Sequence, residues 1–220
     1  MHVGRKLAML NPRTSQFRVG SGGLPAIVAT DVAAALGMVE PGIGREMLCR
    51  VWWPDGAKLT AHELKNLVDE MMREEWARRE SSMLDATLAV AMRGSRAQGV
   101  YATAHAARWP RMIVREHEVP VAASGYGRVR DAVLEELASA GLCQACLGRG
   151  EVANDMRVYR ICKDCSGQGH LRVSERSRAD LCGFSWKTYR EGWASVYDWT
   201  FQACTDDLHR AERQFQGAMA

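Results

Sequence analysis

The sequence predicts a mainly α-helical protein. Apolar residues recur at spacings of three and four along much of the chain, which is the period of an amphipathic helix. Two C-x-x-C pairs lie fifteen residues apart in the C-terminal half, and a basic segment with the residue order of two helices around a tight turn follows them. Together these features predict a helical N-terminal domain plus a C-terminal helix-turn-helix domain with an inserted four-cysteine zinc module.

The composition is that of an ordinary soluble globular protein. The chain has 220 residues, of which 47% are hydrophobic and 25% charged, and its net charge is +3. This length is sufficient for a hydrophobic core. There is no run of about 18 apolar residues, and no apolar signal core follows the basic N-terminus, so we expect a cytoplasmic protein without a membrane span. In that reducing compartment the seven cysteines are expected as metal ligands or buried thiols rather than disulfides.

The first domain is predicted over 30–125, after a poorly structured arm over 1–29. The arm has little periodicity and ends in a Gly-Gly-Leu-Pro turn signal. Thr30-Asp31 is expected to cap a short helix that runs through Leu36, with Gly37 as the stop because glycine readily takes the left-handed conformation.

The clearest helix start in this domain is a capping box at Thr60. The Thr60 hydroxyl can accept the backbone N–H of Glu63, whose side chain reaches back to the Thr60 N–H. Two further helices are expected after this one, over about 82–92 and 96–108. The apolar face of the first helix comprises Leu64, Leu67, Val68, Met71 and Met72.

The second domain is predicted over 126–220. The segment before it, 111–127, contains a proline and two glycines and is expected to form the boundary, with a short strand at 112–115. The expected elements of the second domain are a helix, the cysteine module and two further helices, over 128–140, 143–170, 175–182 and 185–216.

Four cysteines in two copies of the pattern C-x-x-C-x-G-x-G predict one structural zinc ion. Each C-x-x-C turn directs two sulfurs at one ion, and two turns complete a tetrahedron with Zn–S distances of about 2.3 Å. The glycines after each pair allow positive φ, so that backbone N–H groups can turn toward the sulfurs. All four ligands are thiolates and no position is left open, so the zinc is expected to be structural rather than catalytic. The ligands are Cys143, Cys146, Cys162 and Cys165.

Two other interpretations of these cysteines are weaker. Unrelated cysteines would not share the duplicated glycines, and a redox dithiol would not need the second pair. His170 lies five residues after Cys165 and can compete as a ligand, but a solvent-facing or backbone-bonded histidine is favoured. The remaining cysteines stand in apolar or helical contexts and are expected to be buried thiols: Cys49, Cys182 and Cys204.

Residues 175–194 have the arrangement of a helix-turn-helix. A small residue, Ala179, stands where the two helices would cross, Gly183 stands at the tight turn, and Ser185 is placed to cap the second helix. In this motif the second helix enters the DNA major groove. The apolar residues expected between the helices are Leu181, Cys182, Phe184 and Tyr189.

The charge of this segment supports DNA binding. Five basic and two acidic residues lie between His170 and Arg190, a concentration expected of a phosphate-binding face. An ordinary helical hairpin with a solvated basic face is the alternative. Arg176 and Arg178 are expected against phosphates, where contacts position the protein without reading sequence. The residues expected at base edges, at the N-terminal end of the second helix, are Ser185, Trp186, Lys187 and Arg190.

Two further patterns are interpreted as structural. Adjacent carboxylates at Glu74-Glu75 and Glu135-Glu136 are expected on solvated helix faces. The chain contains no nucleophile elbow, phosphate loop or open metal site, so an enzyme is not expected. An aromatic stripe in the last helix is expected to belong to the core: Tyr189, Trp193, Tyr197, Phe201, Cys204 and Leu208.

The sequence resembles the Q antitermination proteins of lambdoid phages, of the phage lambda type. The resemblance is carried by the cysteine module, by the segment TDVAAALGM at 30–38 and by the helical segment 188–204, and it extends loosely over 30–210. The cysteine pattern alone is not specific, since DnaJ-type chaperones use the same unit. The order of the three segments along the chain makes the resemblance to the Q proteins more specific than the cysteine pattern alone.

The resemblance implies a regulator that binds a DNA element at a phage late promoter and engages the paused host RNA polymerase holoenzyme. It would then travel with the polymerase in the bacterial cytoplasm and make it resistant to pausing and termination. The four cysteines carry over as zinc ligands and the helix-turn-helix as the DNA-recognition element, with the polymerase contacts on the helical domain. The sequence is also compatible with self-association.

Two alternatives stay open. The protein could regulate initiation from a promoter with the same helix-turn-helix, without travelling with the polymerase. It could also be a zinc-dependent DnaJ-like binding module, although it has only two cysteine knuckles, no His-Pro-Asp tripeptide and a basic helix-turn-helix that a chaperone would not need.

Overall fold

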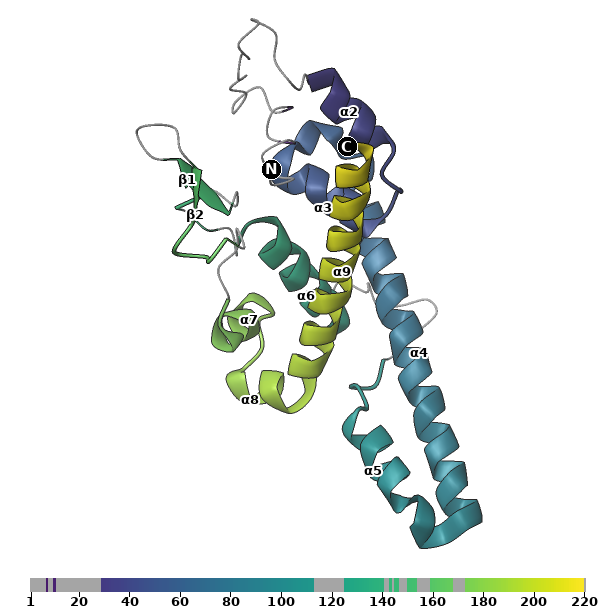
Figure 1. Ribbon diagram of the computed structural model, residues 1–220. Coiled ribbons are helices and arrows are strands. Elements are labelled where there is room, and N and C mark those ends of the chain that lie inside the picture. Colours follow the sequence, from purple (N-terminus) through teal and green to yellow (C-terminus); the bar gives the residue numbers. More distant parts are fainter. Residues whose placement is uncertain are drawn as a thin grey trace, which may run out of the picture. The chain divides into compact units, whose positions relative to one another are not determined.

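The computed structural model is mainly helical, as the periodicity predicts (Figure 1). The structure describes residues 7, 10, 29–112, 125–140, 143, 145–146, 150–153, 159–167 and 173–219. Within these ranges, no helix combines the length and the apolar character needed to cross a membrane. The expectations for the arm over 1–29 and for the strand at 112–115 fall largely outside the described residues.

The helices and strands follow one another in the order below. Two segments, η5 and η6, are π-helical, and η2 and η3 are short 3₁₀ turns. The bounds are α2 Ala29–Gly37, α3 Ile43–Trp52, η2 Pro54–Gly56, α4 Ala61–Arg93, η3 Gly94–Ala97, α5 Gln98–Ala106, α6 Gly125–Glu135, η5 Glu136–Ala140, β1 Glu151–Ala153, β2 Tyr159–Ile161, α7 Glu175–Leu181, α8 Trp186–Thr188, η6 Tyr189–Trp193 and α9 Ala194–Ala218.

The chain forms two compact units. One comprises Met1–Leu64, Leu134–Ser174 and Phe201–Ala220, and the other comprises Lys65–Val133 and Glu175–Thr200. This grouping does not follow the sequential division expected at residue 126, because the long helices α4 and α9 each contribute to both units. The expected domains therefore stay a prediction about which parts fold independently.

The first unit has a hydrophobic core between α2, α3 and the C-terminal part of α9. Val32, Leu48 and Phe215 are fully or almost fully buried in it. The backbones of α3 and α9 approach closely at Gly44, where an added Cβ would lie 2.1 Å from the Asp207 carbonyl oxygen. Glycine is therefore required there for packing.

A buried carboxylate organises the turn between α3 and α4. Glu46 is 2% exposed and accepts hydrogen bonds from the backbone N–H groups of Lys58 (2.9 Å) and Leu59 (3.1 Å) and from the Arg45 guanidinium (2.9 Å). These bonds compensate the desolvation of the charge. The capping box that follows is confirmed, because Glu63 N donates to the Thr60 hydroxyl at 3.2 Å and Thr60 N donates to the Glu63 carboxylate at 2.7 Å.

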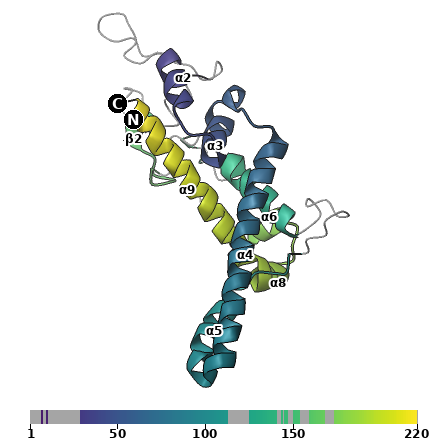
Figure 2. The same cartoon turned by 90° about the vertical axis from the view of Figure 1, so that its right-hand side faces the viewer.

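α4, most of which belongs to the second unit, is a single helix of 33 residues, and α5 runs back along it (Figure 2). The expectation of a separate helix over 82–92 is wrong. The polar stretch before it continues the helix, because its residues are good helix formers and Glu75 pairs with Arg78 (2.6 Å) and Arg79 (2.7 Å) at helical spacing. Arg108, just after α5, pairs with Glu80 of α4 at 2.7 Å.

Two further expectations are corrected. Glu75 and Glu136 are 7% and 4% exposed, so only Glu74 and Glu135 lie on a solvated helix face. The helix expected over 128–140 begins earlier, at Gly125. An added Cβ at Gly125, the first residue of α6, would lie 2.2 Å from the Trp193 ring, so this glycine allows close packing there.

Candidate metal centre and nucleic-acid interface

A two-stranded hairpin brings the two cysteine pairs together. β1 begins five residues after Cys146, β2 ends directly before Cys162, and the strands pair antiparallel with Glu151 opposite Ile161. The Cys162 N–H donates to the Gly150 carbonyl at 2.8 Å, which continues the ladder to the start of the second pair. Sequence analysis missed these strands, because three-residue segments show no clear period.

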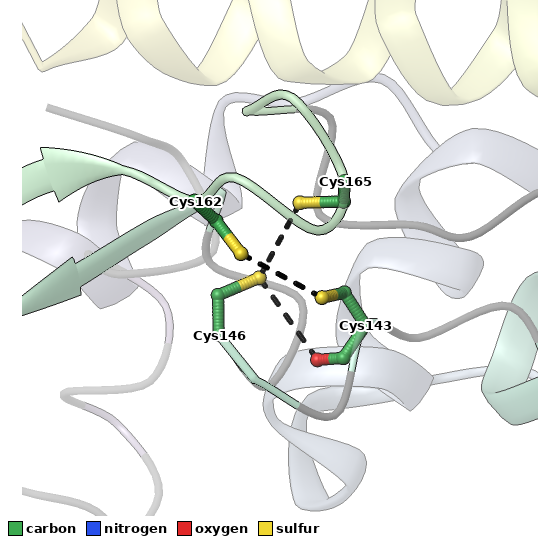
Figure 3. A group of neighbouring side chains, drawn as sticks. All are labelled: Cys143, Cys146, Cys162 and Cys165. Carbon is green, nitrogen blue, oxygen red and sulfur yellow. Dashed lines mark hydrogen bonds between the residues drawn. The ribbon is translucent and has the colours of Figure 1, made fainter.

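The four predicted ligands form one buried cluster (Figure 3). Their sulfurs all lie within 4.8 Å of one another, and each of the four cysteines is at most 5% exposed. The Cys143 and Cys162 sulfurs are 3.7 Å apart, as are those of Cys146 and Cys165. This is too long for a disulfide, whose S–S distance is about 2.05 Å.

The spacing is compatible with a metal site. Four sulfurs placed tetrahedrally about 2.3 Å from a zinc ion are roughly 3.8 Å apart, close to the two distances observed. Four thiolates are also the soft donor set that selects zinc or iron–sulfur centres over hard cations such as Mg²⁺ or Ca²⁺. The residues present therefore fit a single, fully coordinated metal ion.

Glycines shape the two turns as expected. Gly150 has a φ of +72° and Gly167 a φ of +85°, both in the region that favours glycine. The Gly150 N–H donates to the Cys146 sulfur at 3.3 Å, the type of contact that stabilises a metal-bound thiolate. An added Cβ at Gly150 would lie 2.3 Å from the Gly167 carbonyl oxygen, so the two turns meet where only a hydrogen fits.

The cysteine module, residues 143–167, has little else to hold it together. Among its described residues, the buried side chains are those of the four cysteines. Its larger apolar residues lie at the surface, with Val152 40% and Ile161 71% exposed. Without a metal, burial raises the pKa of the Cys146 thiol, so it is a neutral thiol that would release its proton on binding a metal cation. A bound cation would supply both the charge balance and the cohesion that the module lacks.

The other sequence expectations for cysteines are met where they are described. Cys49, Cys182 and Cys204 are buried thiols that form no disulfide. Burial raises the pKa of Cys49 to about 11 and of Cys204 to about 12, which makes both unreactive at neutral pH. His170 lies outside the described residues.

The local geometry of the segment after the cysteine module follows the sequence closely. α7 ends at Leu181, Gly183 takes a φ of +65°, and the chain turns into α8. Ser185 caps the second helix, since its hydroxyl accepts the Thr188 N–H at 3.1 Å. Ala179 is 1% exposed, as a residue between two crossing helices should be.

An aromatic network holds this turn, and it includes residues that sequence analysis did not single out. Phe184 stacks on Trp193 with ring centroids 5.0 Å apart, and Tyr126 of α6 packs against Trp193 in a T-shaped arrangement, also with ring centroids 5.0 Å apart. Arg128 donates to the Gly183 carbonyl at 3.1 Å and lies 4.0 Å over the Phe184 ring. Arg128 therefore fixes the turn from α6, a role that no local sequence signal reveals.

The six residues predicted to bind DNA lie in different settings. Arg176, Ser185, Trp186, Lys187 and Arg190 are exposed. The Ser185 hydroxyl is used as a cap. Arg178 is 14% exposed, pairs with Asp198 at 3.0 Å and lies 4.9 Å over the Tyr197 ring, so its guanidinium is already engaged within the fold. The expected DNA contacts stay a prediction, and the accessible cations among them are Arg176, Lys187 and Arg190.

Comparisons with known proteins do not assign this arrangement: no family model, curated protein or solved structure matches the chain.

Proposed function

We propose that this protein is a phage late-gene antitermination factor. It binds double-stranded promoter DNA through α7, α8 and η6, associates with host RNA polymerase holoenzyme and suppresses pausing and termination. The observation that carries the DNA-binding part is the exposed group Trp186, Lys187 and Arg190 at the capped N-terminal end of the second helix. The N-terminal residues of a recognition helix are those that reach base edges in the major groove. The antitermination part rests on the resemblance of the sequence to the Q proteins.

The metal in this proposal is one structural zinc ion bound by the four cysteines. The two S···S distances of 3.7 Å, the all-thiolate donor set and the buried setting support it. Zinc would hold the cysteine module in its folded form, and it would take no part in any chemistry because all four positions are filled by protein ligands. A single bound zinc in the purified protein, measured by mass spectrometry under non-denaturing conditions, is the expected result.

Exposed apolar side chains support a protein partner. Leu84, Leu88 and Met92 recur every four residues along α4 and are more than half exposed, and Val100 of α5 is exposed as well. Exposed apolar groups of this kind mark protein–protein contacts. We assign the polymerase contact to this face of α4 and α5. Leu88→Glu should weaken copurification with polymerase, whereas Met38→Glu, at an exposed site just after α2, should leave it unchanged.

A purified transcription assay tests the function as a whole. The template carries a phage late promoter followed by a terminator, and the protein is added to polymerase holoenzyme. We expect more full-length transcript with little change in the rate of initiation. A change in initiation with termination unaffected would contradict antitermination and favour the alternative of a promoter-binding regulator.

The DNA face is tested separately by a matched pair of variants. Lys187→Ala should weaken duplex binding by about 1–3 kcal/mol if the contact is to a base edge, and by less if it is to a phosphate. Arg213→Ala removes the same charge from an exposed site near the end of α9 and should leave binding nearly unchanged. Equal effects of the two variants would indicate unspecific attraction by net charge and contradict the assignment of the recognition helix.

A further inference from the structure

We propose that Arg190 recognises a guanine edge in the DNA and that Trp186 is the positioning residue that holds its guanidinium for this contact. The inference rests on the proposed function and deepens it, because it names the base and the pair of side chains that would read it. It starts from a difference between two arginines in the same unit.

Arg178 and Arg190 are held by different kinds of partner. Arg178 is held by a carboxylate, Asp198, at 3.0 Å. Arg190 lies with its Cζ 5.5 Å over the Trp186 ring, and within the described part of the chain no ion pair to it is found. A carboxylate accepts hydrogen bonds from the N–H groups at the edge of a guanidinium, whereas an aromatic ring packs against its planar face. Arg190 therefore keeps its charge and its N–H edge available to a ligand.

The ring that holds Arg190 is itself anchored. Trp186 is 39% exposed, but it stacks on Tyr189 with ring centroids 6.3 Å apart and an interplanar angle of 18°. Tyr189 is fully buried and packs edge-on against Tyr197, also fully buried, at 6.0 Å. The Arg190 side chain is thus connected through two stacked rings to the core of the unit, and less of its conformational freedom is lost on binding.

The position of Arg190 selects the ligand. The N–H edge of a guanidinium matches two acceptors side by side, which both guanine (O6 and N7) and a phosphate present. Arg190 lies about one turn from the Ser185 cap, at the end of the helix that enters the groove in a helix-turn-helix. That location favours the base edge over the phosphate backbone. The two contacts also differ in a measurable way, since a base contact discriminates between sequences and a phosphate contact does not.

The experiment uses the full chain and randomised DNA duplexes as the probe. Wild-type protein selects a consensus duplex, and affinities are then measured for this duplex and for versions in which one G·C pair at a time is replaced by A·T. We expect Arg190→Lys to lose discrimination at one G·C pair while it keeps the salt dependence of binding, and Arg190→Ala to lower the affinity about tenfold or more. Trp186→Ala should lower the affinity by roughly two- to fivefold and weaken the discrimination at the same G·C pair. Trp186→Phe, which keeps an aromatic ring, should restore part of the affinity and part of the discrimination.

Several outcomes would overturn the inference. If Arg190→Lys discriminates between sequences at every base pair as well as wild type does, Arg190 contacts a phosphate and the inference is wrong. Trp186→Ala with unchanged discrimination would remove the positioning role. In either case the wild-type protein still selects a sequence, so the proposed function survives. If the wild-type protein binds no duplex, the proposed function and the inference fail together. Thermal unfolding of each variant separates these results from misfolding, and the exposed Arg190 substitutions and Trp186→Phe, which keeps a stacking ring, should match wild type.

Discussion

The cysteine module and the helical turn between α7 and α8 are both short, glycine-containing segments, but different forces hold them. In the module, the buried described side chains are four cysteines, and its larger apolar residues face solvent. In the turn, Phe184 and Trp193 stack at 5.0 Å, and Ala179 and Cys182 are buried. We therefore propose that the first segment needs a bound metal ion to hold its fold, whereas the second is stabilised by its own side chains.

One glycine in each segment makes the difference concrete. Gly150 and Gly183 both have positive φ, +72° and +65°. Beside Gly150 there is no room for a methyl group, because the Gly167 carbonyl oxygen is in the way at 2.3 Å. Beside Gly183 the nearest atom to an added Cβ is Arg128 Nη1 at 3.7 Å, an ordinary contact. An alanine at position 150 would therefore meet both a steric clash and backbone strain, whereas an alanine at position 183 would meet backbone strain alone.

The largest expected effect is that of removing a metal ligand. Cys146→Ser should abolish metal binding and unfold the cysteine module, because structural zinc supplies on the order of 10 kcal/mol of apparent free energy. DNA binding should be lost as a consequence. Metal content and circular dichroism measure the change, and Cys182→Ala, which removes a buried thiol outside the module, should keep one equivalent of metal. Normal stability with a defect only in polymerase binding would instead make the module a contact surface.

A smaller loss is expected at the closest backbone approach in the module. Gly150→Ala should lower the free energy of unfolding by about 2–5 kcal/mol, since it combines positive-φ strain with overpacking. Competition with a chelator should show weakened metal binding. Gly217→Ala, in open space near the end of α9, is the control and should be neutral or stabilising. Equal metal affinity in Gly150→Ala and wild type would mean that the two turns can move apart at no cost.

The corresponding glycine-to-alanine substitution in the turn should lower the free energy of unfolding by less than Gly150→Ala does. Gly183→Ala introduces only the strain of a left-handed alanine, about 1–2 kcal/mol, and should leave metal affinity unchanged. Thermal unfolding measures the first quantity and chelator competition the second. A cost as large as that of Gly150→Ala would contradict the distinction drawn between the two glycines.

The smallest effect is expected at Tyr189, whose buried hydroxyl has no hydrogen-bond partner within the described part of the chain. Tyr189→Phe should change the free energy of unfolding by less than about 1 kcal/mol or raise it, because it removes an unsatisfied polar atom and keeps the stacking ring. Burial raises the pKa of Tyr189 well above its usual value, so the phenol is neutral across the neutral pH range and this difference should not depend on pH there. Tyr197→Phe is the comparison: it loses a hydrogen bond to the Ala132 carbonyl and should be the less stable of the two.

Much of the candidate site follows from local sequence. Each C-x-x-C turn and its glycines act within a few residues, so the sequence predicts each pair of ligands, while the β1–β2 hairpin, which it did not predict, brings the two pairs into one cluster. The capping box at Thr60 and the Ser185 cap formed as predicted for the same reason, since a cap involves only the first turn of its helix. Metal identity and DNA recognition are of a different kind, because they concern partners outside the chain, and both stay proposals.

What only the tertiary structure decided is which polar groups are buried and what each arginine contacts. By itself the sequence determined the helical class, the helix starts at Thr60 and Ser185 and the grouping of the cysteines, because these depend on sterics, hydrogen bonds and ligand spacing over short distances. It did not determine the burial of Glu46, the buried ion pair of Arg130 with Asp69, or the contact of Arg128 with the turn. Those depend on residues far apart in the chain, and a charged side chain in a helical pattern looks the same whether its partner is water or a distant residue.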